Sequence, residues 1–282
     1  MRKPSLTGIY FKSAPTLLAK QIESCFKSDI GPGEIPAFTS KNSKTKAIIT
    51  PFHNYELAGP CAAWGYKALA ESEVPDVVII IGQSYEEAGL ATEPYETPLG
   101  NARVDQVLAR EIKKKGNIKV NNPLFDKDEF IESQLPFIQY IYGREKPPKI
   151  LPLILNVGVD LRNLAVDIKE TLSDQDKKAV IVTPSNFTRF GRNYNYIPFS
   201  TDVVKQVYGL DKGAIDALTN KDPKEYLEYI TKHSMNSENY LGIAFTLLLA
   251  DPKQVLLEQY YTSADINKDY KNFISFASMI LK

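Results

Sequence analysis

The segment KAIITPFHNYELAGPCAAWGYKALAES, residues 46–72, decides the fold class of this 282-residue chain. It begins with a short apolar run and passes through a loop that contains His53, one of only two histidines. Small and apolar residues follow from Gly59-Pro60 onward. A continuously apolar run predicts a buried strand, and a proline in the first turn favours a helix. The segment therefore predicts a strand, a loop and a helix in succession.

The same pattern repeats outward from this segment. Further apolar, β-branched runs predict strands at DVVIII (76–81), KILPLIL (149–155) and AVIVT (179–183). Helical patterns lie at 59–72, 104–116, 128–143 and 161–173. Pro136 is expected to kink or restart the third of these helices. Alternating strands and helices predict an α/β fold, with a mixed, mostly parallel central sheet flanked by helices.

The last third of the chain has a different order of elements. Two helices are predicted at 222–233 and 238–252, followed by strands at 253–263 and 272–281. No stretch rich in Gly, Ser and Pro separates this part from the rest. We therefore expect a single domain over residues 1–282.

Composition excludes several classes of partner. Lys plus Arg and Asp plus Glu both number 34, so the formal net charge is zero and nothing recruits nucleic acid or an anionic membrane. The two cysteines, Cys25 and Cys61, are too few for a disulfide framework or a thiolate metal cage. The first residues lack the apolar core of a signal peptide, and no apolar run approaches the length that spans a bilayer. We expect a soluble, cytoplasmic protein.

Ligands of α/β sheets bind where the strands end. This rule places the candidate site in four loops, which span residues 51–58, 82–89, 156–160 and 184–191. The last loop, with the sequence TPSNFTRFG at 183–191, is rich in side chains that form hydrogen bonds.

Eight short motifs occur in an order and spacing that resemble one family. They are GIYF (8–11), PFHNYELAGP (51–60), GQSY (82–85), TPLG (97–100), ESQLPFIQ (132–139), SNFTRFG (185–191), NYLGIAFTLLLA (239–250) and YYTSAD (260–265). On these motifs the chain resembles the Memo family nearly from end to end. That family in turn resembles the class III extradiol ring-cleaving dioxygenases in fold.

The resemblance also implies that the family's metal site is lost. The three positions that hold a metal in relatives that have one align with Phe52, Tyr85 and Asn239. An Asp and a His of the family's fourth loop align with Asn186 and Arg189. A further family histidine aligns with Glu129. Phenylalanine offers no donor atom, tyrosine and asparagine are poor ligands for such metals, and an arginine would repel a cation. We therefore expect no iron or copper cofactor.

His53 stands one residue beyond the lost histidine position. A rotation of the loop could turn it inward, toward Glu56, Tyr85 or Glu86. Alternatively, it is an ordinary loop residue beside Phe52, which plugs the former site. Ser84 and Ser185 lie in candidate loops, but neither has the surroundings of a catalytic triad.

Arg189 also allows two interpretations. With Asn186 and neighbouring hydroxyl groups it could hold a carboxylate or phosphate. Alternatively, it forms an internal ion pair with Glu129 or Glu132 and fills the space that the metal left. The candidate ligand-binding residues are Phe52, His53, Asn54, Tyr55, Tyr85, Glu129, Glu132, Asn186, Arg189 and Asn239. His53, Tyr85 and Arg189 are the candidates for catalysis, and no residue is assigned as a metal ligand.

Three functions remain open from the sequence. The first is a non-catalytic, metal-free Memo relative that binds a protein partner or a small anionic ligand through its cleft or its aromatic loops. Tyr194, Tyr196 and Phe199 would suit protein contact if they are exposed, or would cap the sheet edge if they are packed. The second is an enzyme of altered chemistry, an oxidoreductase or a hydrolase, that acts on a small anionic substrate. The third is a metal held in an unfamiliar way.

Overall fold

The computed structural model describes residues 1–38, 44–143 and 147–282. Its strands are Ala47–Thr50 (β1), Val77–Gln83 (β2), Gly89–Leu90 (β3), Tyr95–Thr97 (β4), Gly100–Ala102 (β5), Lys149–Leu155 (β6), Ala179–Pro184 (β7), Arg189–Gly191 (β8), Val255–Thr262 (β9) and Asn272–Leu281 (β10). The predicted strands at 46–50, 76–81, 149–155 and 179–183 match β1, β2, β6 and β7 to within two residues.

The helices connect and cover these strands. The α-helices are Pro15–Lys27 (α1), Gly59–Ala70 (α2), Gln106–Lys114 (α3), Glu129–Tyr142 (α4), Leu161–Asp174 (α5), Val203–Thr219 (α6), Pro223–Lys232 (α7), Tyr240–Ala250 (α8) and Ser263–Asn267 (α9). Short 3₁₀ turns occur at Asn122–Phe125 (η1) and Arg192–Tyr194 (η2). Pro136 lies inside α4 without dividing it, so the predicted restart of this helix is wrong.

One eight-stranded sheet organises the fold. Its order is β3-β6-β2-β7-β1-β10-β8, and β9 pairs with β10. The four strands β6, β2, β7 and β1 are mutually parallel, whereas β3 and β10 run antiparallel to their neighbours. The predicted α/β class with a mixed, mostly parallel sheet is therefore confirmed. The carboxyl ends of the four parallel strands share one edge, where the candidate loops begin.

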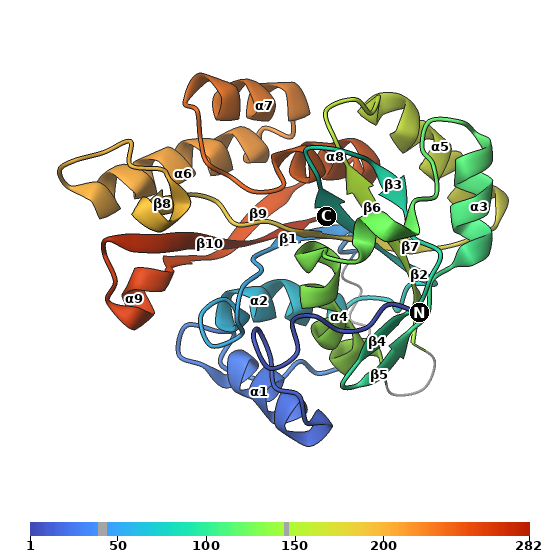
Figure 1. The fold of residues 1–282 in the computed structure, drawn as a ribbon, viewed down its shortest axis with the longest axis horizontal. Coiled ribbons are helices and arrows are strands. Elements are labelled where there is room, and N and C mark those ends of the chain that lie inside the picture. The colour runs from blue at the N-terminus through green and yellow to red at the C-terminus, as the bar shows by residue number, and fades with distance from the viewer. Residues whose placement is uncertain (39–43, 144–146) are drawn as a thin grey trace.

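Helices pack on both faces of the sheet, as Figure 1 shows, with α1, α2 and α4 on one side and α5, α7 and α8 on the other. Side chains of a strand alternate between the faces. Ile48 and Ile80 belong to the core under α2 and α4, whereas Ile49 and Ile79 belong to the core under α5 and α8. Strands that are apolar on both faces explain the continuously apolar runs in the sequence.

None of the helices within the described ranges combines the length and the apolar character needed to cross a membrane.

Candidate functional site

The loop after β1 places Phe52 in the interior at the carboxyl edge of the sheet. Its side chain is buried, and its ring centroid lies 4.6 Å from that of Phe130 in α4. The backbone N–H of Phe52 donates to Asn186 Oδ1 at 3.3 Å, and Asn186 Nδ2 donates back to the Phe52 carbonyl at 2.9 Å. The loops after β1 and β7 are therefore joined through Asn186, and an aromatic ring fills the space between them and α4.

Little space remains behind Phe52. The cavity lined by Phe52, His53, Tyr55 and Phe137 measures about 10 Å³. A volume of this size holds one water molecule at most. The interior at this point is filled and cannot admit a substrate.

Asn239 joins the ends of two strands. It precedes α8 with a φ of 57°, and its Nδ2 donates to the carbonyls of Ile81 at 2.7 Å and Pro184 at 2.6 Å. Its buried Oδ1 has no hydrogen-bond partner in the described part of the chain. A Cβ at position 242 would come within 2.2 Å of that oxygen, so Gly242 is required beside it. Because both amide hydrogens of Asn239 donate to backbone carbonyls, this side chain links the ends of β2 and β7.

Tyr85 points away from this interior. Its side chain is 84% exposed, the largest value among the large hydrophobic residues of the described ranges. Phe52 therefore offers no donor atom, the Tyr85 hydroxyl lies in solvent, and the Asn239 amide is engaged with backbone carbonyls. Among the residues that the structure describes, no group of three or more His, Cys, Asp or Glu side chains is placed to hold a metal ion. The residues present do not fit the family-type iron or copper site.

Arg189 pairs with a residue that the sequence interpretation overlooked. Its Nη1 forms an ion pair with Glu238 Oε1, and the other oxygen of Glu238 accepts from Asn186 Nδ2 at 2.9 Å. The Arg189 guanidinium also lies over the ring of Tyr194, 4.5 Å from its centroid. Burial raises the pKa of Glu238, while Arg189 opposes that rise. The prediction that Arg189 pairs with Glu129 or Glu132 is wrong, because Glu238 directly precedes Asn239 and reaches the same loop.

The two acidic residues of α4 have different partners. Glu129 accepts from the Tyr10 hydroxyl at 2.7 Å. Glu132 is fully buried, where Arg2 Nη1 lies 2.9 Å from its Oε2. Glu132 also accepts from the backbone N–H of Ser5 at 2.8 Å. Glu132 therefore anchors the N-terminal segment, and Glu129 alone remains beside the candidate site.

His53 lies under the same N-terminal segment. Its ring stacks on Tyr10, with centroids 5.5 Å apart and planes 22° apart. Its Nδ1 is buried and has no hydrogen-bond partner within the described residues. Burial lowers the pKa of His53, and the positive charge of Arg189 lowers it further. Both effects on the pKa favour the neutral imidazole. Glu56 does not approach it, because Glu56 pairs with Lys12.

The other loop residues have local structural roles. Asn54 Oδ1 accepts from the N–H of Leu57 at 3.0 Å and shapes the turn before α2. Tyr55 is buried, and its hydroxyl donates to the carbonyl of Ser133 at 2.7 Å. Tyr194, Tyr196 and Phe199 are half-buried, which agrees with packing at the sheet edge better than with full exposure.

The structure thus brings six of the candidate residues to one edge of the sheet, namely Phe52, His53, Glu129, Asn186, Arg189 and Asn239. Glu132 lies instead where α4 contacts the N-terminal segment. Tyr85 lies on the exposed surface of its loop, in the rim of loops around the site. Sequence reasoning overlooked Tyr10, Phe130 and Glu238. The position of Glu238 directly before Asn239 was a usable signal, because a residue next to a site position at the start of a helix also faces the site.

The fold and these loops define an α/β protein with its candidate site at the carboxyl edge of a mixed sheet. The family model described as Memo-like protein matches residues 2–280, so the chain belongs to the Memo family. A MEMO1 family protein of Methanopyrus kandleri is 27% identical over 100% of this chain and 99% of its own length. One from Desulfurococcus amylolyticus is 30% identical, covering 99% of this chain and 98% of the relative.

A solved structure shows the same fold at low identity. An uncharacterized protein from Escherichia coli K12 superposes with a TM-score of 0.53 and 11% sequence identity. The match covers 85% of this chain and 100% of that protein. At this identity the likeness shows the fold alone.

Proposed function

We propose that this chain is a metal-free member of the Memo family that binds a protein partner through the loops around its filled site. One observation carries the proposal. The three most exposed large hydrophobic side chains of the described residues are Tyr85 at 84%, Val157 at 73% and Ile9 at 69%. Tyr85 and Val157 belong to the loops after the paired strands β2 and β6, and Ile9 belongs to the N-terminal segment next to the loop after β1. Exposed large apolar side chains on neighbouring loops are typical of interaction surfaces.

These three segments are connected to one another or to the site. Asn156 Nδ2 donates to the carbonyl of Glu86 at 3.0 Å, which joins the loops of Val157 and Tyr85. The carbonyl of Tyr10, next to Ile9, accepts from the N–H of Tyr55 at 2.8 Å in the loop after β1. Because hydrogen bonds already hold these loops around the site in place, little conformational entropy is lost when their apolar side chains bind a partner.

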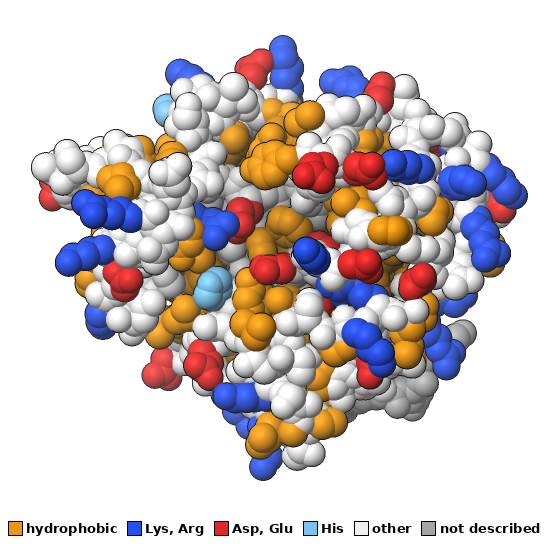
Figure 2. Space-filling view, in the orientation of Figure 1, with side chains coloured by type: hydrophobic (Ala, Val, Ile, Leu, Met, Phe, Trp, Pro, Cys, Tyr) orange, Lys and Arg blue, Asp and Glu red, His pale blue; other side chains and the backbone are white. Residues whose placement is uncertain are grey.

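The charges around the site also favour a protein partner over a small anion. Glu238 neutralises Arg189, so the guanidinium that could have held an anion is already engaged. The face drawn in Figure 2 mixes hydrophobic, acidic and basic side chains without a large area of one charge. Such a mixed surface suits a protein better than a nucleic acid.

The test compares two sets of substitutions. The rim variant carries Ile9→Ser, Tyr85→Ser and Val157→Ser, and the matched control carries serine at Val74, Val107 and Val166, which are exposed elsewhere. Affinity capture from the native cell should recover a partner with the wild type and the control, and about tenfold less with the rim variant. Equal recovery by all three proteins, or no partner at measurable occupancy, would contradict the proposal.

The metal-free part of the proposal has its own test. Elemental analysis of protein purified without chelator or affinity tag should find iron, copper and zinc well below one equivalent. Restoring donors with Phe52→His and Asn239→Cys should raise metal content relative to the wild type. A full equivalent of bound iron, copper or zinc in the wild type would overturn this part of the proposal.

One observation favours the second candidate, an enzyme of altered chemistry. Burial lowers the pKa of His53 and so favours its neutral form, its Nδ1 has no hydrogen-bond partner within the described residues, and it stacks on Tyr10, whose hydroxyl donates to Glu129. A neutral imidazole can act as a general base. A screen against model esters, amides and redox substrates tests this candidate, and turnover that His53→Ala abolishes while the fold is retained would support it.

A further inference from the structure

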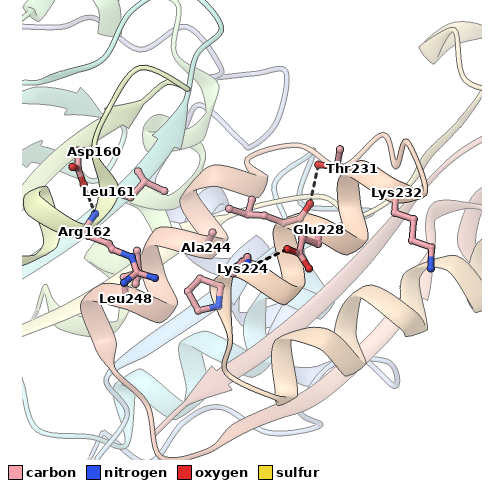
Figure 3. A pocket seen from close by; sticks show the side chains of 11 residues that line it. Asp160, Leu161, Arg162, Lys224, Glu228, Thr231, Lys232, Ala244 and Leu248 are labelled. Carbon is pink, nitrogen blue, oxygen red and sulfur yellow. Dashed lines mark hydrogen bonds and ion pairs between the residues drawn. The ribbon is translucent and has the colours of Figure 1, made fainter.

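A second region with an open, apolar lining lies on the face of the sheet that α5, α7 and α8 cover (Figure 1). It is a groove over α8, between α7 and the first turn of α5, with a volume of about 670 Å³ (Figure 3). Leu227 of α7 and Leu161 of α5 form its sides, and Ala244 and Leu248 of α8 form its floor. The volume falls in the range of about 300–1,000 Å³ that is typical of small-molecule sites.

The groove follows from the composition of α8. This helix, YLGIAFTLLLA, contains no charged residue and is apolar on all sides, so it requires cover from its neighbours. α5 and α7 both pack against it, yet Leu248 and Leu227 remain only half-buried. The two covering helices therefore leave part of the apolar surface of α8 open between them.

The acidic side chains around the groove are already engaged. Asp160 caps α5 and accepts from the backbone N–H groups of Arg162 and Asn163, both at 3.0 Å. Glu228 lies 3.5 Å from Lys224 in an ion pair along α7. The carboxylates of Asp160 and Glu228 thus both have partners among the described residues.

Two basic side chains are different. Neither the Arg162 guanidinium nor the Lys232 ammonium group has a hydrogen bond or ion pair to any residue that the structure describes. Arg162 and Leu248 both line the groove, and Figure 3 shows Arg162 at the end of the groove that α5 forms. The groove therefore combines an apolar interior with an unneutralised guanidinium at its end.

We propose that this groove binds a small amphiphile with a single hydrocarbon chain and an anionic head group. The chain lies on Leu161, Leu227 and Leu248, and the head group pairs with Arg162, whose planar fork suits a carboxylate. A peptide helix about 10 Å across would fill this volume within two turns, so a thinner ligand fits better. The groove is lined by residues other than Ile9, Tyr85 and Val157, and the proposal does not depend on the proposed function.

The experiment uses the full chain and two probes that differ only in their heads. Dodecanoate and dodecyltrimethylammonium, both below their micellar concentrations, are titrated calorimetrically at pH 7.5. Dodecanoate should bind at one site with a Kd on the order of 10 µM, and the cationic probe at least about tenfold more weakly.

Variants assign the site. Arg162→Gln should weaken dodecanoate binding about tenfold and remove the preference between the two heads. Arg110→Gln, at an exposed arginine of α3, is the matched control and should bind as the wild type does. Leu227→Asn should weaken both probes, with urea unfolding as the check that the protein is folded.

Three results would overturn the proposal. The first is the absence of saturable dodecanoate binding to the wild type. The second is equal affinity for the two probes, or an equal effect of the Arg162 and Arg110 substitutions. The third is an acidic amphipathic peptide that binds more tightly than dodecanoate and is weakened by both Arg162→Gln and Leu227→Asn, which would show a protein-docking groove instead.

Discussion

Two arginine–glutamate pairs in this protein use the same chemistry at different depths. Arg2 pairs with Glu132 and lies over Tyr95, 4.9 Å from the ring centroid. Arg189 pairs with Glu238 and lies over Tyr194 at 4.5 Å. The side chains of the first pair are 5% and 1% exposed, and those of the second are 33% and 22% exposed.

The surroundings of the two pairs explain their different roles. Glu132 also accepts from the N–H groups of Ser5 and Leu6, so the deep pair fastens the N-terminal segment to α4. Glu238 shares its carboxylate between Arg189 and Asn186, at an edge that solvent reaches. Burial, and not the pairing itself, therefore decides whether such a pair stabilises the fold or adjusts the charge of a site.

The largest expected effect comes from breaking the deep pair. Arg2→Met should lower the free energy of unfolding by about 3–5 kcal/mol, because it leaves a buried carboxylate without its counter-charge. Lys3→Met is the control, since Lys3 pairs with Glu96 in an exposed position and should cost about 1 kcal/mol or less. Urea denaturation measures both, and equal losses would show that depth does not distinguish them.

The deep region should also make stability depend on pH through Asp128. Its carbonyl accepts from Arg2 at 2.7 Å, and its side chain caps α4. Burial raises the pKa of Asp128 to about 7, against about 3.9 in the unfolded chain. The folded state therefore holds the proton more tightly, and this contribution to stability is present at low pH and is lost as pH rises from about 4 to about 7.

Asp128→Asn should remove that loss while the amide oxygen still caps the helix. Relative to the wild type, the variant should gain on the order of 2–3 kcal/mol in unfolding free energy between pH 4.5 and pH 7.5. Asp222→Asn controls for the loss of a helix-capping carboxylate, since Asp222 caps α7 in an exposed position. An equal change in both variants would contradict burial as the cause.

Breaking the shallow pair should cost much less. Arg189→Met should lower the free energy of unfolding by about 1 kcal/mol, because solvent and Asn186 still stabilise Glu238. The measurement is the same urea series as for Arg2→Met. A loss as large as that of Arg2→Met would show that Arg189 is a structural residue of the interior.

The smallest expected effect is a shift in titration at the site. Arg189 lowers the pKa of His53, so Arg189→Met should raise that pKa, while burial keeps it below the usual value for histidine. Proton NMR of the imidazole resonances measures the shift, and His233→Gln assigns the two signals. An unchanged or lower pKa of His53 would show that Arg189 does not adjust the charge of this loop.

The parallel core of the sheet could be predicted because its signal is local. Strands buried on both faces are apolar at nearly every position, and β1, β2, β6 and β7 have such sequences. Helix α6, residues 203–219, was not predicted. Its two glycines, Gly209 and Gly213, weaken the helical signal, and packing against the rest of the protein compensates for them.

The candidate site was predictable only in part. The loops were correctly placed at the carboxyl edge, and the aligned positions showed which side chains lack donor atoms. The partner of Arg189 was missed, because Arg189 and Glu238 are 49 residues apart and belong to separate loops, and the only signal was the position of Glu238 directly before Asn239. Sequence separation contains no information on which of several carboxylates reaches a guanidinium.

The sequence by itself determined the four parallel strands with the helices between them, and the chemical nature of the side chains at positions 52, 85 and 239. Those properties depend on local periodicity and on atom types, which folding does not alter. Only the tertiary structure decided that Phe52 fills the interior, that Glu238 neutralises Arg189 and that α5 and α7 leave α8 partly uncovered. These outcomes depend on distances between segments, and only packing of the whole chain sets such distances.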